Sequence, residues 1–325
     1  MSNTNLQTRK NIDISTHTGV KVFAPASVAN VACGYDVLGF ALEKPGDEII
    51  VRYSEIPGLR ITKITGTKKQ LPLEVEKNTA GVAALRLLEA LGETTVGIEM
   101  EIHKKMPFGS GLGSSAASAV GGAMAVNELL GRPFEKRDLL TFAVQGESIA
   151  SGAIHADNVA PCLLGGFTLV RDSHTLDIAR LFVPKGMCAV IVYPHIEILT
   201  SEARTMLSPT VPLKNMVQQS ANLGALVVGL YNSDFELIRR SLKDVVIEPQ
   251  RSKLIPHFYD VQNAALEAGA LGCSISGSGP SIFALCNNSF IADEAGKAMT
   301  EIFKKNKIQC ELFISPINQE GVRVV

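Results

Sequence analysis

The chain has 325 residues, 46% of them hydrophobic, and a formal net charge of -1. A chain of this length and composition can bury a large core and has room for two domains or one large one. The near balance of charge gives no electrostatic basis for binding nucleic acid or an anionic membrane, so small molecules are the expected partners.

The sequence predicts a cytoplasmic protein. The first twenty residues are polar and lack the apolar segment of a signal peptide, and no later run reaches the roughly 18–20 apolar residues needed to cross a bilayer. The six cysteines are scattered without a C-x-x-C pair, which indicates neither a zinc ribbon nor a redox dithiol. We expect most of them to be reduced and buried.

The predicted elements of the first half follow a polar N-terminal arm at residues 1–18. Apolar residues alternate along 96–103, as in a half-buried strand, and they recur on one broad face along 79–91, as in a helix. Strands are predicted at 20–25, 48–53, 59–64, 96–103 and 167–170, and helices at 79–91, from Ser114, and at about 135–150.

The second half predicts an α+β domain that resembles a ferredoxin fold. Strands are expected at 188–193, 272–276, 282–286 and 309–314, with helices near Ser201, Leu213, Asp234 and His257 and at 292–304. The pair of strands around 276–280 reads as a hairpin, which favours an antiparallel sheet with helices on one face. We place the domains at 19–178 and 179–325.

A glycine-serine segment, PFGSGLGSSAAS (Pro107–Ser118), connects the strand at 96–103 with the helix from Ser114. Glycines let the backbone approach an anion closely, and the unpaired N–H groups and dipole of a helix N-terminus attract it. Ser114 is expected to cap the helix, and the hydroxyls of Ser114 and Ser115 could bind phosphate or magnesium. This segment is therefore predicted to hold a phosphate.

A glycine-rich turn capped by serine is the simpler explanation of the same segment. It lacks the Gly-Lys-Ser/Thr ending of a Walker A loop and the G-x-G-x-x-G spacing of a dinucleotide loop, and Glu128 is placed wrongly for a ribose contact. Neither of those two nucleotide-binding types is indicated.

Three blocks in order resemble the signatures of the GHMP small-molecule kinases. They are PASVANVACGYDVLGFAL (Pro25–Leu42), PFGSGLGSSAAS and SISGSGPSIFAL, which ends at Leu285. Three ordered blocks are far more specific than one glycine loop. The resemblance implies a two-domain fold, with an N-terminal ribosomal-protein-S5-like α/β domain that binds ATP and a C-terminal ferredoxin-like α+β domain.

Within that superfamily, three further segments resemble the homoserine kinase family. They are QGESIASGAIHADNVAP (Gln145–Pro161), TSEARTML (Thr200–Leu207) and EPQRSKLIP (Glu248–Pro256). The resemblance implies ATP-dependent phosphorylation of the L-homoserine hydroxyl in threonine biosynthesis, by a homodimer. Two alternatives stay open: another GHMP kinase acting on a carboxylate alcohol such as mevalonate, and a nucleotide-binding regulator without catalysis.

The resemblance also implies how an amino-acid alcohol is held. Arg204 and Arg251 would bind its carboxylate, since the planar guanidinium matches a carboxylate with two parallel hydrogen bonds. Asn30, Asp36 and Asn158 would meet its amino and hydroxyl ends, while His155 could contact substrate or only pack in its turn. The expected substrate-binding residues are Asn30, Asp36, His155, Asn158, Thr200, Arg204 and Arg251.

For the nucleotide, Ser115 and Glu147 resemble the magnesium ligands of these kinases, a hydroxyl and a carboxylate that suit a hard cation. Asn78 could cap the helix at 79–91 or contact adenine. The expected ATP-binding residues are Asn78, Pro107, Phe108, Gly109, Ser110, Gly111, Leu112, Gly113, Ser114, Ser115, Ala116, Ala117, Ser118, Gly277, Ser278 and Gly279.

Catalysis is assigned to Asp36, Asn158 and Glu147. Phosphoryl transfer depends mainly on positioning and charge neutralisation, so a general base is not required. We expect Asp36 to accept a hydrogen bond from the substrate hydroxyl. The sequence leaves open whether Asp157 or Asn158 faces the substrate; an asparagine there could orient the hydroxyl but could not take its proton.

The first block departs from the usual family pattern. That pattern is ANLGPGFDVLG, and this chain reads ANVACGYDVLG, with changes at Val31, Ala32, Cys33 and Tyr35. Ala32 cannot take a positive φ as cheaply as glycine, and Cys33 does not fix φ as proline does. We therefore expect a loop of altered shape that keeps its substrate role.

Overall fold

The computed structural model describes residues 19–67, 70–152, 155–198 and 200–325, so the predicted arm at 1–18 lies outside the described residues. Its first half contains β1 (Val20–Ala29), β2 (Leu38–Tyr53), β3 (Leu59–Thr65), α1 (Thr79–Leu91), β4 (Ile98–His103), α2 (Ser114–Leu129), α3 (Leu139–Ser151), α4 (Val159–Leu164), β5 (Phe167–Asp172) and β6 (Asp177–Leu181). Its second half contains β7 (Cys188–Pro194), α5 (Thr200–Thr205), α6 (Leu213–Asn232), α7 (Phe235–Ser241), α8 (Glu248–Arg251), α9 (Phe258–Glu267), β8 (Gly272–Ile275), β9 (Ile282–Cys286), α10 (Ser289–Lys305), β10 (Cys310–Pro316) and β11 (Arg323–Val324).

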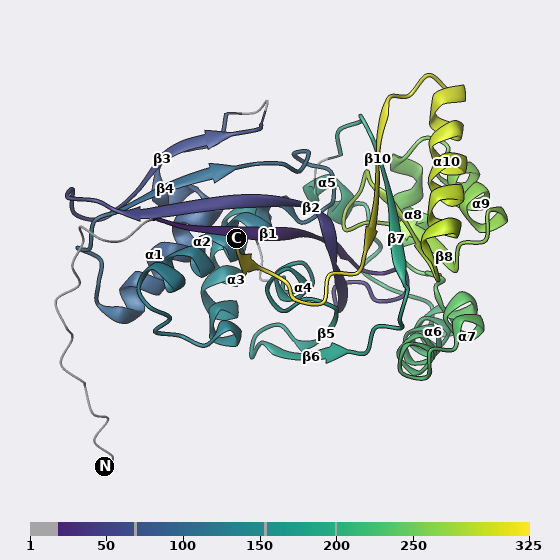
Figure 1. The fold of residues 1–325 in the computed structure, drawn as a ribbon. Helices are drawn as coiled ribbons and strands as arrows, with labels where there is room; N and C mark the ends of the chain where they lie inside the picture. Colours follow the sequence, from purple (N-terminus) through teal and green to yellow (C-terminus); the bar gives the residue numbers. More distant parts are fainter. Residues whose placement is uncertain (1–18, 68–69, 153–154, 199) are drawn as a thin grey trace, which may run out of the picture.

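The first sheet has the order β11-β1-β2-β4-β3, with β5 and β6 attached to β2. Helices α1 to α4 lie on one side of it (Figure 1). Helix α2 is buried over 13 of its 16 residues, because small residues let it pack closely. A Cβ on Gly121 would lie 2.2 Å from Ile49 Cδ1, and one on Gly122 would lie 2.4 Å from the Ala80 carbonyl oxygen. The helix that follows the glycine-serine segment is therefore fixed between β2 and α1.

The second sheet is antiparallel, with the order β10-β7-β9-β8, and α9 and α10 pack against it (Figure 1). Alternate residues of β7 enter different cores, as period-2 side chains must. Val190 joins the core under α9 and α10, whereas Ile191 joins the core of the first sheet. Phe283 of β9 meets Phe40 of β2 at a ring-centroid distance of 5.9 Å. Continuous packing therefore joins the two sheets.

The two-domain α+β fold is confirmed, including the antiparallel β8–β9 pair. Strand β2 begins at Leu38 and is longer than the predicted strand at 48–53. In the structure, Pro25 pairs with Gly46 and Ser27 with Ala41, so residues 42–45 form a bulge. Helices α4 and α8 and strands β6 and β11 were not predicted.

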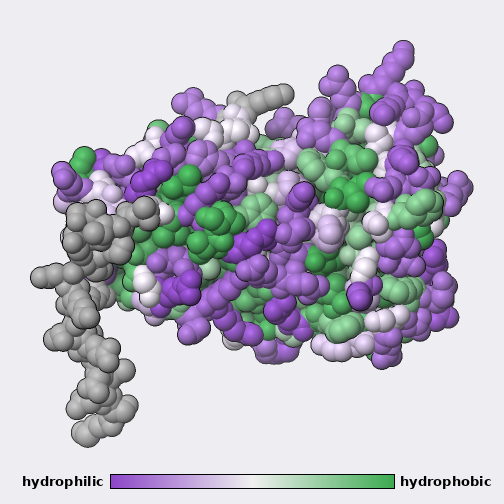
Figure 2. All heavy atoms as spheres, in the orientation of Figure 1, coloured by the Kyte–Doolittle hydropathy of each residue, from purple (hydrophilic) through white to green (hydrophobic). Residues whose placement is uncertain are grey.

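The division at residue 178 stays a prediction. Strand β6 spans it, and β11 returns from the C-terminal end to pair with β1. Hydrophilic residues cover much of the face shown in Figure 2, with apolar patches between them. None of the described helices is long and apolar enough to cross a membrane.

Candidate active site

The segment between β1 and β2, residues 30–36, has an unusual backbone. Asn30, Val31, Ala32 and Asp36 all have positive φ (74°, 41°, 56° and 58°), a conformation that costs energy for residues with a Cβ. Asn30 compensates with its amide: Nδ2 donates to the Gly277 carbonyl at 2.7 Å, and Oδ1 accepts from the Asp36 N–H at 3.0 Å. The altered loop therefore keeps a defined shape that presents Asp36.

Asp36 meets two other predicted substrate residues. Arg204 Nη2 lies 3.4 Å from Asp36 Oδ1 and 3.5 Å from His155 Nδ1, and His155 Nδ1 lies 3.8 Å from Asp36 Oδ1. Burial lowers the pKa of His155, and the Arg204 charge lowers it further. Thr200 begins α5, four residues before Arg204, but its side chain lies outside the described residues. Three predicted residues from separate segments thus form one polar cluster.

Arg251 lies beside this cluster and is only 3% exposed. Its Nε donates to the Ala203 carbonyl at 2.9 Å and its Nη1 to the Gly277 carbonyl at 3.2 Å. Nη2 lies 3.4 Å from the Tyr35 hydroxyl, and the guanidinium carbon lies 5.0 Å from the centre of the Tyr35 ring. No carboxylate of the described residues forms an ion pair with it. A buried cation without a protein anion suits a carboxylate ligand.

The glycine-serine segment forms a turn at the N-terminus of α2. Gly109, Gly111 and Gly113 all have positive φ, as a close approach to a ligand requires. The predicted cap is wrong: the N-cap residue is Gly113, and Ser114 is already the first residue of the helix. The buried Ser114 hydroxyl has no hydrogen-bond partner among the described residues. A left-handed glycine, in place of a serine side chain, therefore begins α2.

A buried ion pair that the sequence did not reveal supports this turn from the protein interior. Lys104, 5% exposed, pairs with the fully buried Asp47 and donates to the Ser114 carbonyl at 2.7 Å and the Ser118 hydroxyl at 2.8 Å. Asp47 also accepts from the Met106 N–H at 3.2 Å. The adjacent pair of lysines just before Pro107 was the only local signal for this contact.

The third sequence block, SISGSGPSIFAL, belongs to the second half of the chain and contacts the glycine-serine turn. The Ser276 hydroxyl donates to the Gly111 carbonyl at 2.7 Å, and the Ser281 N–H donates to the Ser110 carbonyl at 3.1 Å. A Cβ on Gly111 would lie 2.5 Å from the Ser276 carbonyl oxygen. Gly277, predicted to bind nucleotide, faces Asn30 and Arg251 with its carbonyl. The block thus contacts both the turn formed by the glycine-serine segment, called here the phosphate turn, and the polar residues around Asp36 and Arg251, called here the substrate cluster.

The other predicted nucleotide residues fall into two groups. Some lie at the open edge of the turn, and others are bonded or buried within the fold. A Cβ on Gly109 would meet no atom within 4 Å, and Phe108 is 46% exposed, so the outer edge of the turn is open. Asn78 caps α1 by accepting from the Ala80 N–H at 3.0 Å, and its Nδ2 donates to the Pro72 carbonyl, so its amide is engaged within the fold. The side chains of Leu112, Ala116, Ala117 and Ser118 are buried.

Glu147 and Ser115 meet as predicted. The Ser115 hydroxyl donates to Glu147 Oε1 at 2.9 Å, which brings α3 to the N-terminus of α2. Burial raises the pKa of Glu147 to about 7, although the hydrogen bond from Ser115 lowers it. Among the described residues, no three histidine, cysteine, aspartate or glutamate side chains gather to hold a metal. One carboxylate and one hydroxyl fit a magnesium ion whose other ligands are phosphate and water.

Asn158, and not Asp157, lies against the phosphate turn. Its Oδ1 accepts from the Ser27 hydroxyl at 2.9 Å and would lie 2.8 Å from a Cβ on Gly113. Asp157 is 4% exposed, and burial together with the Asp36 charge raises its pKa to about 7. The different positions of these two neighbours depend on long-range packing, and which of them faces the substrate stays a prediction.

A buried carboxyl behind the substrate cluster predicts a pH effect on stability. Burial raises the pKa of Glu248 to about 7 from 4.5, and Ser274 and Gln262 donate to it. The folded chain then holds this proton more tightly than the unfolded chain does. Glu248 should therefore contribute a fall in stability of about 2 kcal/mol as the pH rises from about 5 to 8, in addition to that from Glu147 and Asp157, and Glu248→Gln should remove the Glu248 share.

Urea denaturation of both proteins at pH 5, 6, 7 and 8 measures this difference. Parallel curves of unfolding free energy against pH would show that Glu248 does not titrate in this range.

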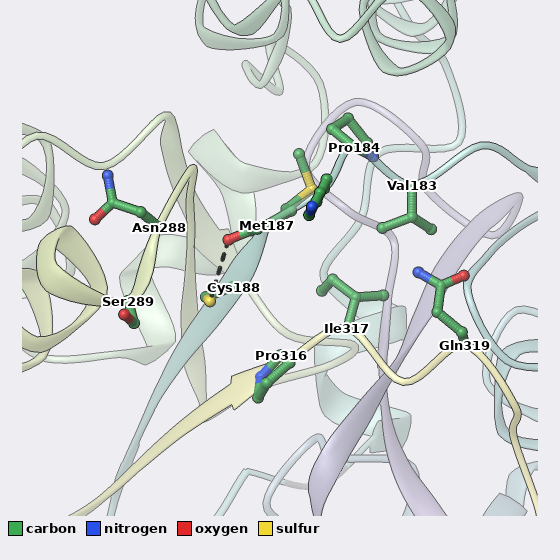
Figure 3. Close-up of a pocket in the computed structure, with 11 residues that line it drawn as sticks. Val183, Pro184, Met187, Cys188, Asn288, Ser289, Pro316, Ile317 and Gln319 are labelled. Atoms are coloured by element: carbon green, nitrogen blue, oxygen red, sulfur yellow. Dashed lines mark hydrogen bonds between the residues drawn. The ribbon is translucent and has the colours of Figure 1, made fainter.

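A pocket of about 400 Å³ lies away from these residues, between the start of β7, the N-terminus of α10 and the end of β10. Figure 3 shows Met187, Cys188, Ile317 and other apolar or amide side chains around it. Its lining contains no carboxylate and no part of the phosphate turn. The predicted catalytic residues Asp36, Glu147 and Asn158 do not line this pocket.

Comparison with known proteins agrees with this geometry. The GHMP kinase N-terminal domain family matches residues 78–166, and the GHMP kinase C-terminal family matches residues 226–305. A homoserine kinase of Chlorobium phaeobacteroides (strain BS1) is 47% identical over 93% of this chain and 98% of its own length, and one of Xylella fastidiosa (strain M12) is 40% identical over 94% of each.

Solved structures give the same result. The crystal structure of homoserine kinase from Cytophaga hutchinsonii is 52% identical, covers 99% of this chain and 100% of its own, and has a TM-score of 0.93. A mevalonate kinase structure has a TM-score of 0.72 at 15% identity, covering 94% of this chain and all of its own, so its likeness concerns the fold alone. The chain belongs to the homoserine kinase family of the GHMP kinases.

Proposed function

We propose that this protein transfers the γ-phosphoryl group of ATP to the side-chain hydroxyl of L-homoserine, giving O-phospho-L-homoserine and ADP. The observation that carries this proposal is that a buried Arg251, which forms no ion pair with a described carboxylate, lies beside the cluster that contains the carboxylate of Asp36. An amino acid has both the carboxylate that the first requires and the ammonium that the second can bind. Mevalonate has a carboxylate and a hydroxyl but no ammonium.

The chain's own groups explain how transfer could proceed. Arg204 and Arg251 would hold the substrate carboxylate, and Asp36 and Asn30 would orient the amino and hydroxyl ends. Asn158, which lies beside Gly113, would orient the hydroxyl next to the phosphate turn. Magnesium held by Ser115 and Glu147 would supply charge neutralisation on the phosphates. No general base is assigned, since Asp157 is turned into the interior.

A direct assay tests the function. The purified protein with magnesium, ATP and L-homoserine should form O-phospho-L-homoserine, detected by phosphorus NMR, whereas mevalonate should give little product. Equal use of mevalonate would favour the other kinase activity. ATP binding without turnover on either alcohol would favour a nucleotide-binding regulator.

The role of Asp36 gives a second prediction. Asp36→Asn should lower kcat by about 100-fold, because a neutral amide accepts a weaker hydrogen bond from the hydroxyl and leaves Arg204 without its carboxylate neighbour. Steady-state kinetics with homoserine measure it, with Asp177→Asn, an exposed carboxylate paired with Arg171, as the control. Near-normal turnover of Asp36→Asn would remove Asp36 from the mechanism.

Three further features belong to the proposal. Magnesium is the expected metal, a homodimer is the expected assembly, and the cytoplasm is the expected location. The first is supported by the Ser115–Glu147 contact.

A further inference from the structure

Tyr35 stands at a position where the usual family pattern has phenylalanine, so its hydroxyl distinguishes this chain from that pattern. It precedes Asp36 in the loop between β1 and β2, and its side chain is half-buried. Burial and the charge of Asp36 raise the pKa of Tyr35 above its usual value. The hydroxyl therefore keeps its proton at neutral pH and can donate a hydrogen bond.

The ring of Tyr35 covers one face of the Arg251 guanidinium. The guanidinium carbon lies 5.0 Å from the centre of the ring, within the range of a cation–π contact. The edge of the guanidinium is held as well, because Nε donates to the Ala203 carbonyl at 2.9 Å and Nη1 donates to the Gly277 carbonyl at 3.2 Å. These contacts fix the plane of the guanidinium, with Nη2 lying 3.4 Å from the Tyr35 hydroxyl.

The Tyr35 hydroxyl has a proton that none of the described residues accepts. Its oxygen is the acceptor in the contact with Arg251 Nη2, because a guanidinium only donates. A phenol can accept one hydrogen bond and donate another at the same time. The neighbouring carboxylate of Asp36 contacts Arg204 and His155 instead. The O–H group of Tyr35 can therefore bind an acceptor that a ligand brings.

A carboxylate bound to Arg251 Nη2 would lie within reach of this hydroxyl. Hydrogen bonds between a guanidinium and a carboxylate are about 2.8 Å long, and the hydroxyl lies 3.4 Å from the same nitrogen. One carboxylate oxygen can therefore accept from both groups, at about 2.7 Å from the hydroxyl. Because the hydroxyl is neutral, it adds a directional contact without adding a charge that would need its own counter-ion.

We propose that Tyr35 is a specificity-determining residue of this site, whose hydroxyl donates a second hydrogen bond to the substrate carboxylate held by Arg251. The ring fixes the guanidinium, and the hydroxyl binds the carboxylate directly. This inference rests on the proposed function, because it deepens how that site selects an amino acid. The contact involves neither the substrate hydroxyl nor the phosphate turn, so it should govern affinity for the carboxylate and leave the transfer step unchanged.

Tyr35→Phe tests the contact, because it removes the hydroxyl, keeps the ring and restores the residue of the usual family pattern. The Kd and KM for L-homoserine should rise about 20-fold, since a hydrogen bond to a charged group is lost, while kcat and the KM for ATP should change less than about 2-fold. Calorimetry measures the Kd without turnover, and steady-state kinetics measure the other constants. Tyr53→Phe is the matched control, because the Tyr53 hydroxyl donates to the Leu129 carbonyl at 3.0 Å, at the far end of α2.

A substrate without the carboxylate separates this role from a general weakening of the site. Tyr35→Phe should lower the preference for homoserine over 3-aminopropan-1-ol, which lacks the carboxylate, by about 20-fold, whereas a disturbed site would lose both substrates alike.

A double variant tests whether the hydroxyl binds the carboxylate directly. Adding Tyr35→Phe to Arg251→Met should lower that preference by a further factor of about 3 or more, because the hydroxyl would still bind the carboxylate without the guanidinium. No further loss would show that the hydroxyl acts only through Arg251 and would overturn the direct contact. A Tyr35→Phe variant with wild-type affinity for homoserine would overturn the proposal while the proposed function stands. A wild type that neither binds nor phosphorylates homoserine would overturn both.

Discussion

Replacing Arg251 with methionine is expected to lower kcat/KM for L-homoserine by about 1000-fold, or about 4 kcal/mol, mainly through a higher KM for homoserine. The guanidinium is buried and no described carboxylate pairs with it, so a substrate carboxylate would meet it in a site of low polarity. Removing one partner of such a charged contact costs about 2–5 kcal/mol. The KM for ATP should change little, since the phosphate turn does not contact Arg251.

A shortened substrate separates this role from a loss of folding. 3-Aminopropan-1-ol is homoserine without its carboxylate, so the wild type should discriminate strongly against it and Arg251→Met should discriminate weakly. Arg251→Lys, which keeps the charge but loses the planar fork, should fall between the two. Arg239→Met is the matched control, because Arg239 also donates to a backbone carbonyl, that of Ala270, away from the site. If Arg251→Met kept the wild-type preference, Arg251 would not bind the carboxylate.

The parts of the site that the sequence predicted are those with a local cause. Gly109, Gly111 and Gly113 need positive φ, and a helix must follow them to present its N–H groups, so the pattern is visible within a dozen residues. The prediction that Ser114 caps the helix was wrong for an equally local reason. Gly113 itself took the left-handed conformation at the N-cap, which left serine inside the helix.

The remaining parts of the site depend on contacts between residues that are far apart in the sequence, and these could not be predicted from it. Arg204 and Arg251 have no local signature and were identified only through the family resemblance. The position of Asn158 against the phosphate turn depends on Ser27, which lies 131 residues away in sequence. Tyr35, seen only as a departure from the family pattern, proved to cover the Arg251 guanidinium. Such pairings exist only after the two sheets pack together.

Glu147→Gln is expected to lower kcat by about 1000-fold at any attainable magnesium concentration. The amide keeps the size of the side chain and can still accept the hydrogen bond from Ser115, so the contact between α2 and α3 should survive. It lacks the negative charge that a hard divalent cation prefers in its ligands. The charge neutralisation that phosphoryl transfer needs would therefore be lost while the fold remains.

Calorimetric titration with ADP distinguishes loss of the metal from loss of the nucleotide site. Magnesium should strengthen ADP binding to the wild type but hardly at all to Glu147→Gln, and the affinity for ADP without magnesium should be the same in both. Glu128→Gln, at the other end of α2 and paired with Arg132, is the control for removing a negative charge from the same domain. Equal stimulation by magnesium in Glu147→Gln and wild type would exclude Glu147 as a ligand.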